Sequence, residues 1–587
     1  MRTRFTAIST ARLLLRPSEI EGGCVWAIAP SDAADGRTVG RVQLWAPVPG
    51  GRQAELTYAL LPMYAGSGFM GEALAAVCDF AFRTGGFDLL TAAADAQSDA
   101  ENLLRQLGFT CEQESETDEK GQACWQLPAP PVFRQDAAEL VIPLPEEVWQ
   151  VLQALEAKGH EAYVVGGCVR DSLLGLAPGD WDICTSALPE EVTACFPAKN
   201  VIATGIKHGM VTVLRGGRAL EVTTYRQDGP YHDKRHPSGV VFVRLLKEDL
   251  ARRDFTVNAM AYHPRTGIAD PYGGLADLRA GTLRAVGDAR QRFEEDALRI
   301  LRALRFAGRL GLTIEPGLAA AIHECRELLR FVSAERVAAE LCGILRGVGA
   351  RQILTEYADV LAVPVPEILP CLGAVQNNPY HDKDVWTHTA AAVASAPPDD
   401  LVRLAAFFHD MGKPACLTTS EDGVSHFYGH AQVSEKIADA VLRRLRFSNA
   451  DREEVCRLVK RHDIPLRPTP LARWLGRLGE TTLRRLIKLK RADVLAHVYT
   501  VWEKYLPRLI DLEEETEQLL RQGAAFSLKD LAVNGDDVMA AGLPQGKQVG
   551  RALQHLLDAV LDGKIENTRE ALLAELSKQL QSGKNAE

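Results

Sequence analysis

The stretch of residues 163–186 constrains the fold of this 587-residue chain more than any other. A short apolar run, residues 163–165, stops at a pair of glycines, and a helical pattern follows from about Cys168. Glycine lets the backbone pass close to a ligand, and the first turn of a helix presents free N–H groups to an anion. Arg170 adds a fixed positive charge in that turn. The stretch therefore predicts a strand, a glycine turn and a helix that bind phosphate through Gly167 and Arg170.

Two carboxylates follow a Pro-Gly turn near the end of this stretch. Asp180 and Asp182 lie in a run, residues 180–184, that we expect to be a strand. Residues two apart on a strand share a face, so these carboxylates repel each other unless a cation neutralises them. Mg²⁺ prefers such oxygen ligands. Each feature alone is more often an ordinary turn or a solvated strand edge, but together they predict phosphoryl or nucleotidyl transfer. Glu221 is a third carboxylate candidate, although a lone glutamate on a strand is more often solvated.

The order G-G-x-V-R-D followed by D-x-D resembles the first motif of the class II tRNA nucleotidyltransferases, which are CCA-adding enzymes, and of bacterial poly(A) polymerases. Residues 252–260 also match the family's R-R-D-F-T-x-N-A motif almost letter for letter. The resemblance implies that Arg253 contacts the nucleotide and that Asp254 and Asn258 shape the site. Residues 225–237 are polar and rich in Gly and Pro, and they resemble the flexible loop of complete CCA-adding and A-adding enzymes. The charges expected to work in this loop are Asp233 and Arg235.

A strongly helical segment, residues 294–306, carries the family's E-D-x-x-R motif. One stripe of this helix is apolar, and a second, charged stripe recurs every three residues. The charged stripe consists of Asp296, Arg299, Arg302 and Arg305. Such a stripe is usually a solvated face, but the motif favours a functional interpretation here.

Asp296 and Arg299 have the chemistry to select bases without a nucleic-acid template. Cytosine and adenine each present an amino donor beside a ring-nitrogen acceptor, which suits a carboxylate beside a guanidinium. Uracil and guanine present a carbonyl and an N–H there, so the same pair would face them with the wrong polarity. We expect Arg302 and Arg305, further along the stripe, to reach the triphosphate.

A second constellation lies in the helical part of the chain after about Gly308. Its order, a histidine, an adjacent H-D-x-G-K and a distant aspartate, resembles the HD phosphohydrolase domain. Imidazoles and carboxylates in this order bind divalent metal and activate water. The expected ligands are His388, His409, Asp410 and Asp493, with His430 and His462 as further candidates for a two-metal site.

Residues 1–130 form a separate unit of strands, followed by a G-x-G turn into a helix and a final L-G-F. This order resembles the GNAT acetyltransferase fold. Met63 stands where the pattern has Gln or Arg, and the short link from Arg16 to Cys24 leaves no room for the two helices that normally build the acceptor site. We therefore expect a degenerate domain that does not acetylate efficiently. Weak binding of coenzyme A or docking of a partner remains open.

Charge and composition limit which partners and which cellular location we expect for the chain. The net charge of −10 argues against a general nucleic-acid coat, but residues 473–491 hold seven Lys or Arg and only one acidic residue, Glu480. This run is a candidate contact for an RNA backbone. The twelve cysteines include no C-x-x-C pair, and no apolar run is long enough to span a bilayer. We expect a cytoplasmic protein with no membrane partner.

These observations predict a multidomain α+β chain. The expected parts are a GNAT-like domain (1–130), a nucleotidyltransferase head (138–270), a helical neck and body that selects the base (271–370), an HD domain (371–500) and a helical RNA-binding tail (501–587). The resemblance implies addition of C, C and A to the tRNA 3′ end from CTP and ATP, with Mg²⁺ at the head and a transition metal or Mg²⁺ at the HD site. A poly(A) polymerase or A-adding enzyme is the near alternative, and an HD-type phosphoester hydrolase is the alternative from another class.

Overall fold

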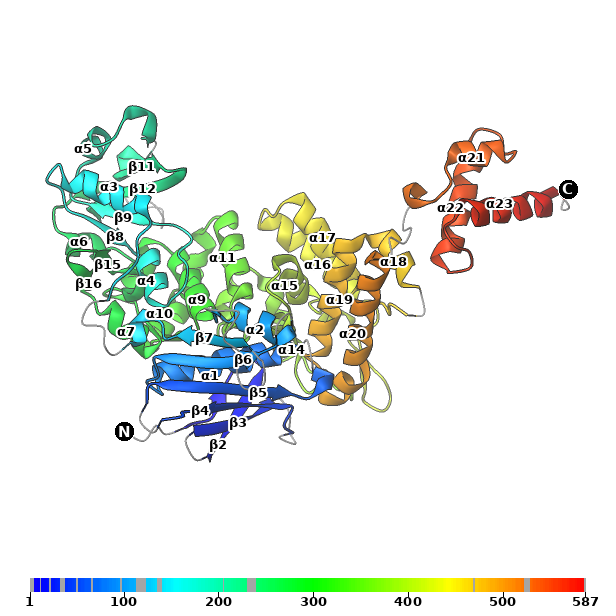
Figure 1. Cartoon of the computed structure of the whole chain (residues 1–587), viewed down its shortest axis with the longest axis horizontal. Coiled ribbons are helices and arrows are strands. Elements are labelled where there is room, and N and C mark those ends of the chain that lie inside the picture. The colour runs from blue at the N-terminus through cyan, green and yellow to red at the C-terminus, as the bar shows by residue number, and fades with distance from the viewer. Residues whose placement is uncertain are drawn as a thin grey trace. The chain divides into compact units, whose positions relative to one another are not determined.

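The computed structural model describes residues 5–10, 12–20, 23–31, 37–48, 51–64, 67–95, 98–111, 123–134, 140–203, 205–229, 239–467, 470–521 and 528–584. The chain divides into two compact units, Met1–Leu369 and Pro370–Glu587. The first unit combines two mixed sheets with helices, and the second is almost entirely helical (Figure 1). This confirms the multidomain α+β prediction. Among the described residues, no helix is both long and apolar enough to cross a membrane.

The N-terminal sheet has seven strands in sequence order, β1 to β7. Neighbours are antiparallel except β5 and β6, which pair in parallel and are connected in the sequence by helix α1. The predicted strands and the helix that ends near Phe82 are present, whereas the strand that closes the sheet after the charged residues 112–120 was not predicted. The elements are β1 (Ile8–Ser9), β2 (Leu13–Ile20), β3 (Gly23–Pro30), β4 (Gly40–Trp45), β5 (Gln53–Leu60), α1 (Phe69–Arg83), β6 (Leu89–Ala94), α2 (Asp99–Gln106) and β7 (Ala123–Pro128).

This N-terminal sheet domain is bonded to the rest of the first unit at helix α7 (Gly274–Ala280). Arg83, at the end of α1, donates to the carbonyl oxygens of Leu278 and Arg279 at 2.9 Å and stacks on the ring of Phe133. These carbonyls belong to the last turn of α7, where the helix supplies few donors of its own, and the carbonyl of Leu278 also accepts from the N–H of Gly281. The arginine therefore caps the end of α7 from another domain.

The head contains a second seven-stranded sheet, in the order β10-β11-β12-β9-β8-β15-β16. Only β12 and β9 are parallel. The strands are β8 (Ala162–Val165), β9 (Asp182–Thr185), β10 (Val201–Ile202), β11 (Met210–Arg215), β12 (Arg218–Thr224), β15 (Ala261–His263) and β16 (Gly267–Ala269), and the helices are α3 (Glu146–Glu156), α4 (Gly167–Leu173), α5 (Pro189–Ala194) and α6 (Leu246–Ala251). A hairpin of β13 (Arg226–Asp228) and β14 (Val240–Phe242) carries the predicted loop, whose residues Asp233 and Arg235 lie outside the described residues.

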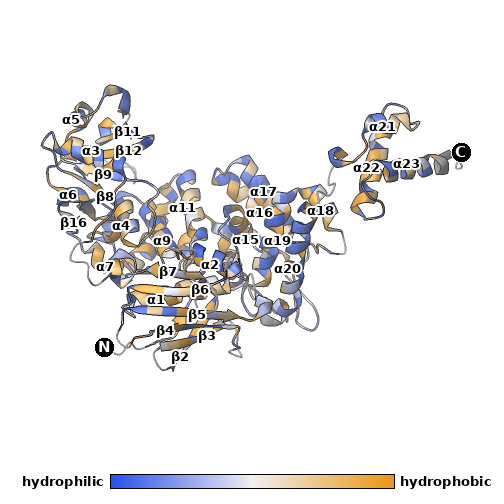
Figure 2. Cartoon of the chain, in the orientation of Figure 1, coloured by the Kyte–Doolittle hydropathy of each residue, from blue (hydrophilic) through white to orange (hydrophobic). Residues whose placement is uncertain are grey.

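Helices follow the head. Those of the first unit are α8 (Ala289–Glu295), α9 (Leu298–Leu310), α10 (Pro316–Cys325), α11 (Ala334–Arg346), α12 (Ala350–Glu356) and α13 (Ala358–Leu361). Hydrophobic and hydrophilic residues lie side by side along such helices (Figure 2), as expected where one face is buried. Strands do not vanish after Gly308 as predicted, because two-residue strands recur at β18 (Thr313–Ile314), β19 (Thr418–Thr419) and β20 (Ser425–His426).

The second unit packs helices around a core that includes Phe407 and Phe408, both fully buried. Its helices are α14 (Val385–Ser395), α15 (Asp400–Phe408), α16 (His430–Arg444), α17 (Asn449–Arg461), α18 (Leu471–Leu478), α19 (Glu480–Val494) and α20 (Tyr499–Arg521). Three further helices, α21 (Gly535–Ala540), α22 (Lys547–Leu561) and α23 (Arg569–Lys584), close around a small core of their own that contains Val538, Leu556 and Leu572.

Candidate active sites

The glycine turn after β8 lies against Arg253 of the R-R-D motif in the head. Gly166 adopts a left-handed φ of 82°, and a Cβ there would lie 2.8 Å from Nη1 of Arg253. Only glycine fits this conformation and this close approach without strain. The turn therefore places the start of α4 against the R-R-D motif, although the two segments are more than 80 residues apart.

Arg170 does not extend from α4 as a free charge. It is 3% exposed, and its guanidinium forms a two-point ion pair with Asp171 at 2.6 and 2.8 Å. It also donates to Oδ1 of Asn258 at 2.5 Å and lies over the ring of Phe306. The structure thus corrects the prediction of a phosphate-facing Arg170. This arginine is buried, and its hydrogen bond fixes the side chain of Asn258.

The two predicted metal ligands lie at the start of β9, beside a third carboxylate. Asp182 is the first residue of the strand, whereas Asp180 precedes it, so the expected strand over 180–184 begins two residues late. Glu221 of β12 is the register partner of Asp182 in the parallel pairing. Burial raises the pKa of Asp182 to about 6, with further contributions from Asp180 and Glu221, against the lowering effect of Arg253. Burial is the largest cause of this raised pKa and the neighbouring carboxylates add to it, so the charged form of Asp182 is disfavoured unless a cation offsets it.

The R-R-D-F-T motif forms a buried network. Asp254 accepts hydrogen bonds from Arg302 at 2.7 and 2.8 Å, from Asn258 and from the backbone N–H of Phe255. Burial would raise the pKa of Asp254, but Arg302 and Asn258 outweigh it and lower the pKa to about 2. Arg302 is therefore held by a carboxylate in this structure and is not extended toward a triphosphate.

The predicted helix over 294–306 is broken at Asp296. Helix α8 ends at Glu295, Asp296 has extended backbone angles (φ −136°, ψ 104°), and α9 begins at Leu298. The single charged stripe is therefore wrong at its first member, because Asp296 lies outside both helices. Its carboxylate accepts from the backbone N–H of Leu298 and caps the start of α9.

Asp296 and Arg299 are each held by a residue that sequence reasoning missed. Arg336 of α11 pairs with Oδ2 of Asp296 at 2.8 Å, and Glu295 pairs with Arg299 at 2.7 Å. Arg299 also donates to the backbone oxygen of Arg252 at 2.9 Å. The four-residue spacing of Glu295 and Arg299 was a readable signal for their pairing. Further along α9, Arg305 pairs with Glu340 of α11 at 2.6 Å.

Four ligand atoms converge in the second unit, in what we name the inner set. They are Nε2 of His388 and His409, Oδ2 of Asp410 and Oδ1 of Asp493, and the five measured separations lie between 2.9 and 3.5 Å. Bonds of about 2.0–2.2 Å from a metal to such atoms place neighbouring ligands roughly 3.0–3.5 Å apart. The inner set therefore has the spacing of a metal site.

A second set adjoins the inner set through Asp410, whose other oxygen faces His430 and His462. The Nε2 atoms of these histidines lie 3.4 and 3.7 Å from Oδ1 of Asp410 and 3.2 Å from each other. One carboxylate thus faces both sets, as a bridging ligand of a two-metal site does. The structure brings together all six predicted HD residues, from segments up to 105 positions apart.

Backbone carbonyls orient the rings of both sets. Nδ1 of His409, His430 and His462 lies 2.7–2.8 Å from the carbonyl oxygen three residues earlier in each case. An Nδ1–H that donates to a carbonyl directs Nε2 toward the metal position. Burial lowers the pKa of His409, but Asp410 and Asp493 outweigh it and raise the pKa to about 10, so without metal Nε2 of His409 carries a proton that a metal ion would displace. The buried carboxylates are already compensated: His409 and Lys413 outweigh burial and hold the pKa of Asp410 well below its usual value. Burial lowers the pKa of His388 to about 4, so its ring is neutral.

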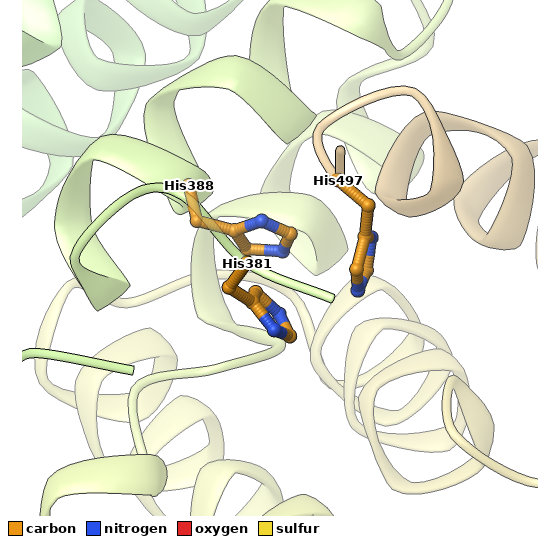
Figure 3. A group of neighbouring side chains, drawn as sticks. All are labelled: His381, His388 and His497. Atoms are coloured by element: carbon orange, nitrogen blue, oxygen red, sulfur yellow. The ribbon is translucent and has the colours of Figure 1, made fainter. Parts of the chain in front are cut away.

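Two histidines near the inner set were not predicted. His381 and His497 form with His388 an outer set whose ligand atoms lie within 4.8 Å of one another (Figure 3). His497 follows Asp493 by one helical turn, and His381 precedes His388 by seven residues. Both positions were visible in the sequence, but neither belongs to the H…HD…D order.

The predicted basic run on α18 and α19 is largely neutralised within the second unit. Arg473 pairs with Asp562, Arg484 with Glu480 and Glu517, Arg485 with Asp399 and Glu454, and Arg491 with Glu513. Among the described residues of this run, Arg477 and Lys488 are exposed. Four of the seven basic residues of the run are therefore paired with acidic residues of the second unit, and the contact with an RNA backbone stays a prediction.

Comparisons with known proteins agree with this arrangement. Family models match the poly A polymerase head domain over residues 162–284, an RNA- and SrmB-binding segment of polymerase A over 311–360 and tRNA nucleotidyltransferase domain 2 over 416–576. An acetyltransferase (GNAT) domain model matches residues 2–110.

Similar proteins extend over most of the chain. The CCA-adding enzyme of Levilactobacillus brevis is 36% identical over 444 residues, which cover 73% of this chain and 98% of the relative. The CCA-adding enzyme of Geobacillus stearothermophilus is 35% identical over 436 residues, covering 73% and 96%. The crystal structure of the Bacillus stearothermophilus CCA-adding enzyme in complex with CTP is 31% identical, covers 75% of this chain and 98% of that one, and superposes with a TM-score of 0.54. The chain therefore belongs to the CCA-adding enzymes, a family of tRNA nucleotidyltransferases.

Proposed function

We propose that this chain adds C, C and A to the 3′ end of tRNA from CTP and ATP and releases pyrophosphate. The observation that carries the assignment is the cluster of Asp180, Asp182 and Glu221 beside the Gly166 turn and Arg253. A bound CTP in a relative that is 31% identical supports the same substrate class here.

Asp180 and Asp182 would hold Mg²⁺, and the raised pKa of Asp182 marks a pocket whose negative charge such an ion would offset. When bound, the ion polarises the α-phosphate and neutralises charge that develops as the tRNA 3′-hydroxyl attacks. Arg253 and the backbone of Gly167 are proposed to contact the triphosphate. Arg170 acts through Asn258 and is a positioning residue, not a phosphate contact.

Asp296 and Arg299 are proposed to read the base. Glu295 and the carbonyl of Arg252 occupy part of the Arg299 guanidinium and leave further N–H groups for a ring nitrogen. Arg336 likewise fixes the Asp296 carboxylate while leaving lone pairs for an amino group. Arg302 and Arg305 would have to exchange their partners, Asp254 and Glu340, to meet a triphosphate. Asp233 and Arg235 are proposed to act in the loop outside the described residues.

The test is incorporation of labelled CTP and ATP, offered separately and together, into tRNA that lacks its 3′ end. We expect CTP alone to add two residues and ATP to add one residue only after C. Addition of A to tRNA that already ends in C, without any addition of C to tRNA that lacks its 3′ end, would support the A-adding alternative. Long A tracts would support a poly(A) polymerase.

We also propose a metal-dependent phosphohydrolase site in the second unit. The bridging position of Asp410 between the inner and second sets is the observation that favours it. The six residues would hold two ions, a transition metal or Mg²⁺, which together supply an activated water for a phosphoester. The test is hydrolysis of a panel of phosphomonoesters and phosphodiesters after metal loading, with Asp410→Ala expected to abolish it. Hydrolysis that persists in Asp410→Ala would overturn this assignment.

A further inference from the structure

Three members of the inner set are buried, whereas the side chain of the fourth, Asp493, is 21% exposed. His388 and His409 are 0% exposed and Asp410 is 1% exposed. The side chain of His497 is 15% exposed, and His381 is half-buried. Asp493 is thus the solvent-exposed member of the inner set, and Nδ1 of His497, one helical turn later, lies 3.6 Å from its carboxylate.

The three outer rings are arranged around a common space (Figure 3). Their centroids are 4.4 Å apart for His381 and His497, 4.8 Å for His388 and His497, and 5.0 Å for His381 and His388. Nδ1 of His388 is buried and has no hydrogen-bond partner among the described residues. A cation in this space would satisfy all three rings.

Hydrogen bonds fix which nitrogen each outer ring offers. Nδ1 of His497 lies 2.7 Å from the backbone oxygen of Asp493, and Nδ1 of His381 lies 2.9 Å from Oδ1 of Asn378. Each Nδ1–H has an acceptor, so each Nε2 is left as a lone pair. The carbonyl that orients His497 belongs to Asp493, a ligand of the inner set, so a shift of Asp493 would also turn the His497 ring.

Lys413 shows that a positive charge is accommodated between the two sets. Its ammonium lies 2.7 Å from Oδ2 of Asp410 and 3.4 Å from Nε2 of His381, and it also donates to Gln376. One cation of the chain thus contacts an inner ligand and an outer ligand at once. An incoming ion would replace the ammonium at these two contacts in turn.

We propose that His381, His388 and His497 form an outer metal position through which the buried phosphohydrolase centre is loaded. His388 belongs to both sets, so an ion bound outside passes inward by exchanging His381 and His497 for His409, Asp410 and Asp493. An all-imidazole position binds Zn²⁺, Co²⁺, Ni²⁺ or Fe²⁺ and discriminates against Mg²⁺, which prefers oxygen ligands. The outer position therefore also selects which metal enters. This inference rests on the proposed metal centre.

The experiment follows Co²⁺ binding to the full chain after chelator treatment and dialysis. Loading is timed by the visible absorbance of bound Co²⁺, and the bound metal is counted at equilibrium by mass spectrometry. The variants are His381→Gln and His497→Gln, and the control is His426→Gln, a half-buried histidine of the same unit outside all three sets.

We expect all variants to reach the wild-type count, with loading and loss to chelator slowed about tenfold or more in His381→Gln and His497→Gln only. Wild-type rates in both variants would overturn the loading role. A count lowered by one would also overturn it, because the outer position would then be a permanent third site. If the wild-type chain itself binds no Co²⁺, the metal centre fails. If it loads and the variants load equally fast, the centre stands and only the outer position fails.

Discussion

Two aspartates of this chain, Asp182 in the head and Asp410 in the second unit, have opposite electrostatic surroundings. Asp182 is half-buried beside Asp180 and Glu221, and its pKa is raised to about 6. Asp410 is buried among histidines and Lys413, and its pKa is held well below the usual value. The head is thus a negative pocket that requires a cation from outside. The HD centre carries its own compensation and must exchange it when metal arrives.

Loss of the head carboxylates should produce the largest effect. We expect Asp180→Ala or Asp182→Ala to reduce nucleotide addition by at least about a thousandfold, or roughly 4 kcal/mol of transition-state stabilisation, because the metal loses its ligands. The control is Glu190→Ala, an exposed acidic residue of α5. The measurement is single-turnover addition of CTP to tRNA. Near-normal addition by a folded double variant would contradict the metal assignment.

Substitution of the central aspartate of the HD centre should destabilise the protein. Asp410→Asn removes the carboxylate that contacts Lys413 at 2.7 Å and His409 at 3.2 Å, and it leaves a buried ammonium uncompensated. Breaking a buried pair in this way costs about 3–5 kcal/mol. We expect that loss in denaturant unfolding of the metal-free chain, with nucleotide addition unchanged. Asp422→Asn, on an exposed turn, should change neither quantity. An unchanged unfolding free energy in Asp410→Asn would contradict the compensation argument.

At the head, by contrast, Asp182→Asn should stabilise the metal-free protein at neutral pH. The unfolded pKa is 3.8 and the folded pKa is about 6, so above pH 6 the folded state bears the charge repulsion. As the pH falls from 6 toward 4, the folded wild type takes up a proton that the unfolded chain does not, and its stability recovers. This rise of the Asp182 pKa on folding corresponds to roughly 3 kcal/mol of destabilisation above pH 6. We expect the variant's advantage at pH 7.5 to vanish near pH 4 and to shrink when Mg²⁺ is added.

The sequence predicted the order of elements at both sites but not how their charges are paired. The Gly166 turn, the D-x-D pair and the six HD residues follow from local patterns whose chemistry requires those residue types. Arg170 and Arg302 were assigned to phosphates because an arginine on a helix looks free in sequence. Arg170 pairs with the adjacent Asp171, but its second partner, Asn258, lies 88 positions away, and Asp254, the partner of Arg302, lies 48 positions away. No local pattern reports these distant pairings.

The break at Asp296 was missed for a related reason. Most of residues 294–306 favour helix, and a single aspartate does not interrupt the periodicity, which predicts one continuous element. Asp296 instead accepts the N–H of Leu298 and pairs with Arg336, 40 positions away. Tertiary contacts of this kind override local propensity. They also leave the base-reading carboxylate on a bend, where its direction differs from that of the arginines on α9.

Base selection offers a smaller effect. Arg299→Ala removes one half of the base-reading pair, and each lost contact should cost on the order of 1–3 kcal/mol of discrimination against UTP and GTP. Glu295→Gln, which loosens the same guanidinium, should shift discrimination in the same direction by less. Arg330→Ala, an exposed arginine of the first unit, is the control. The measurement is kcat/KM for all four nucleotides. An equal loss of rate for every nucleotide would make Arg299 a structural or catalytic residue instead.

The smallest expected effect is at the N-terminal domain, where we predict no efficient acetyl transfer. Its parallel strands and α1 keep the GNAT arrangement, but the first turn of α1 carries Glu72, whose carboxylate pairs with Arg12 at 2.6 Å. Arg12 also donates to the backbone oxygen of Ser67 and lies over Phe69. A positive charge that could meet a pyrophosphate is therefore neutralised in place. Calorimetry of the full chain with acetyl-CoA should give no micromolar binding, and incubation with amines should give no turnover.

Glu72→Gln sharpens the test, because it frees Arg12 while leaving the fold of the sheet intact. Binding that appears only in this variant would show that the ion pair blocks the pyrophosphate position, whereas micromolar binding with turnover in the wild type would prove the prediction wrong.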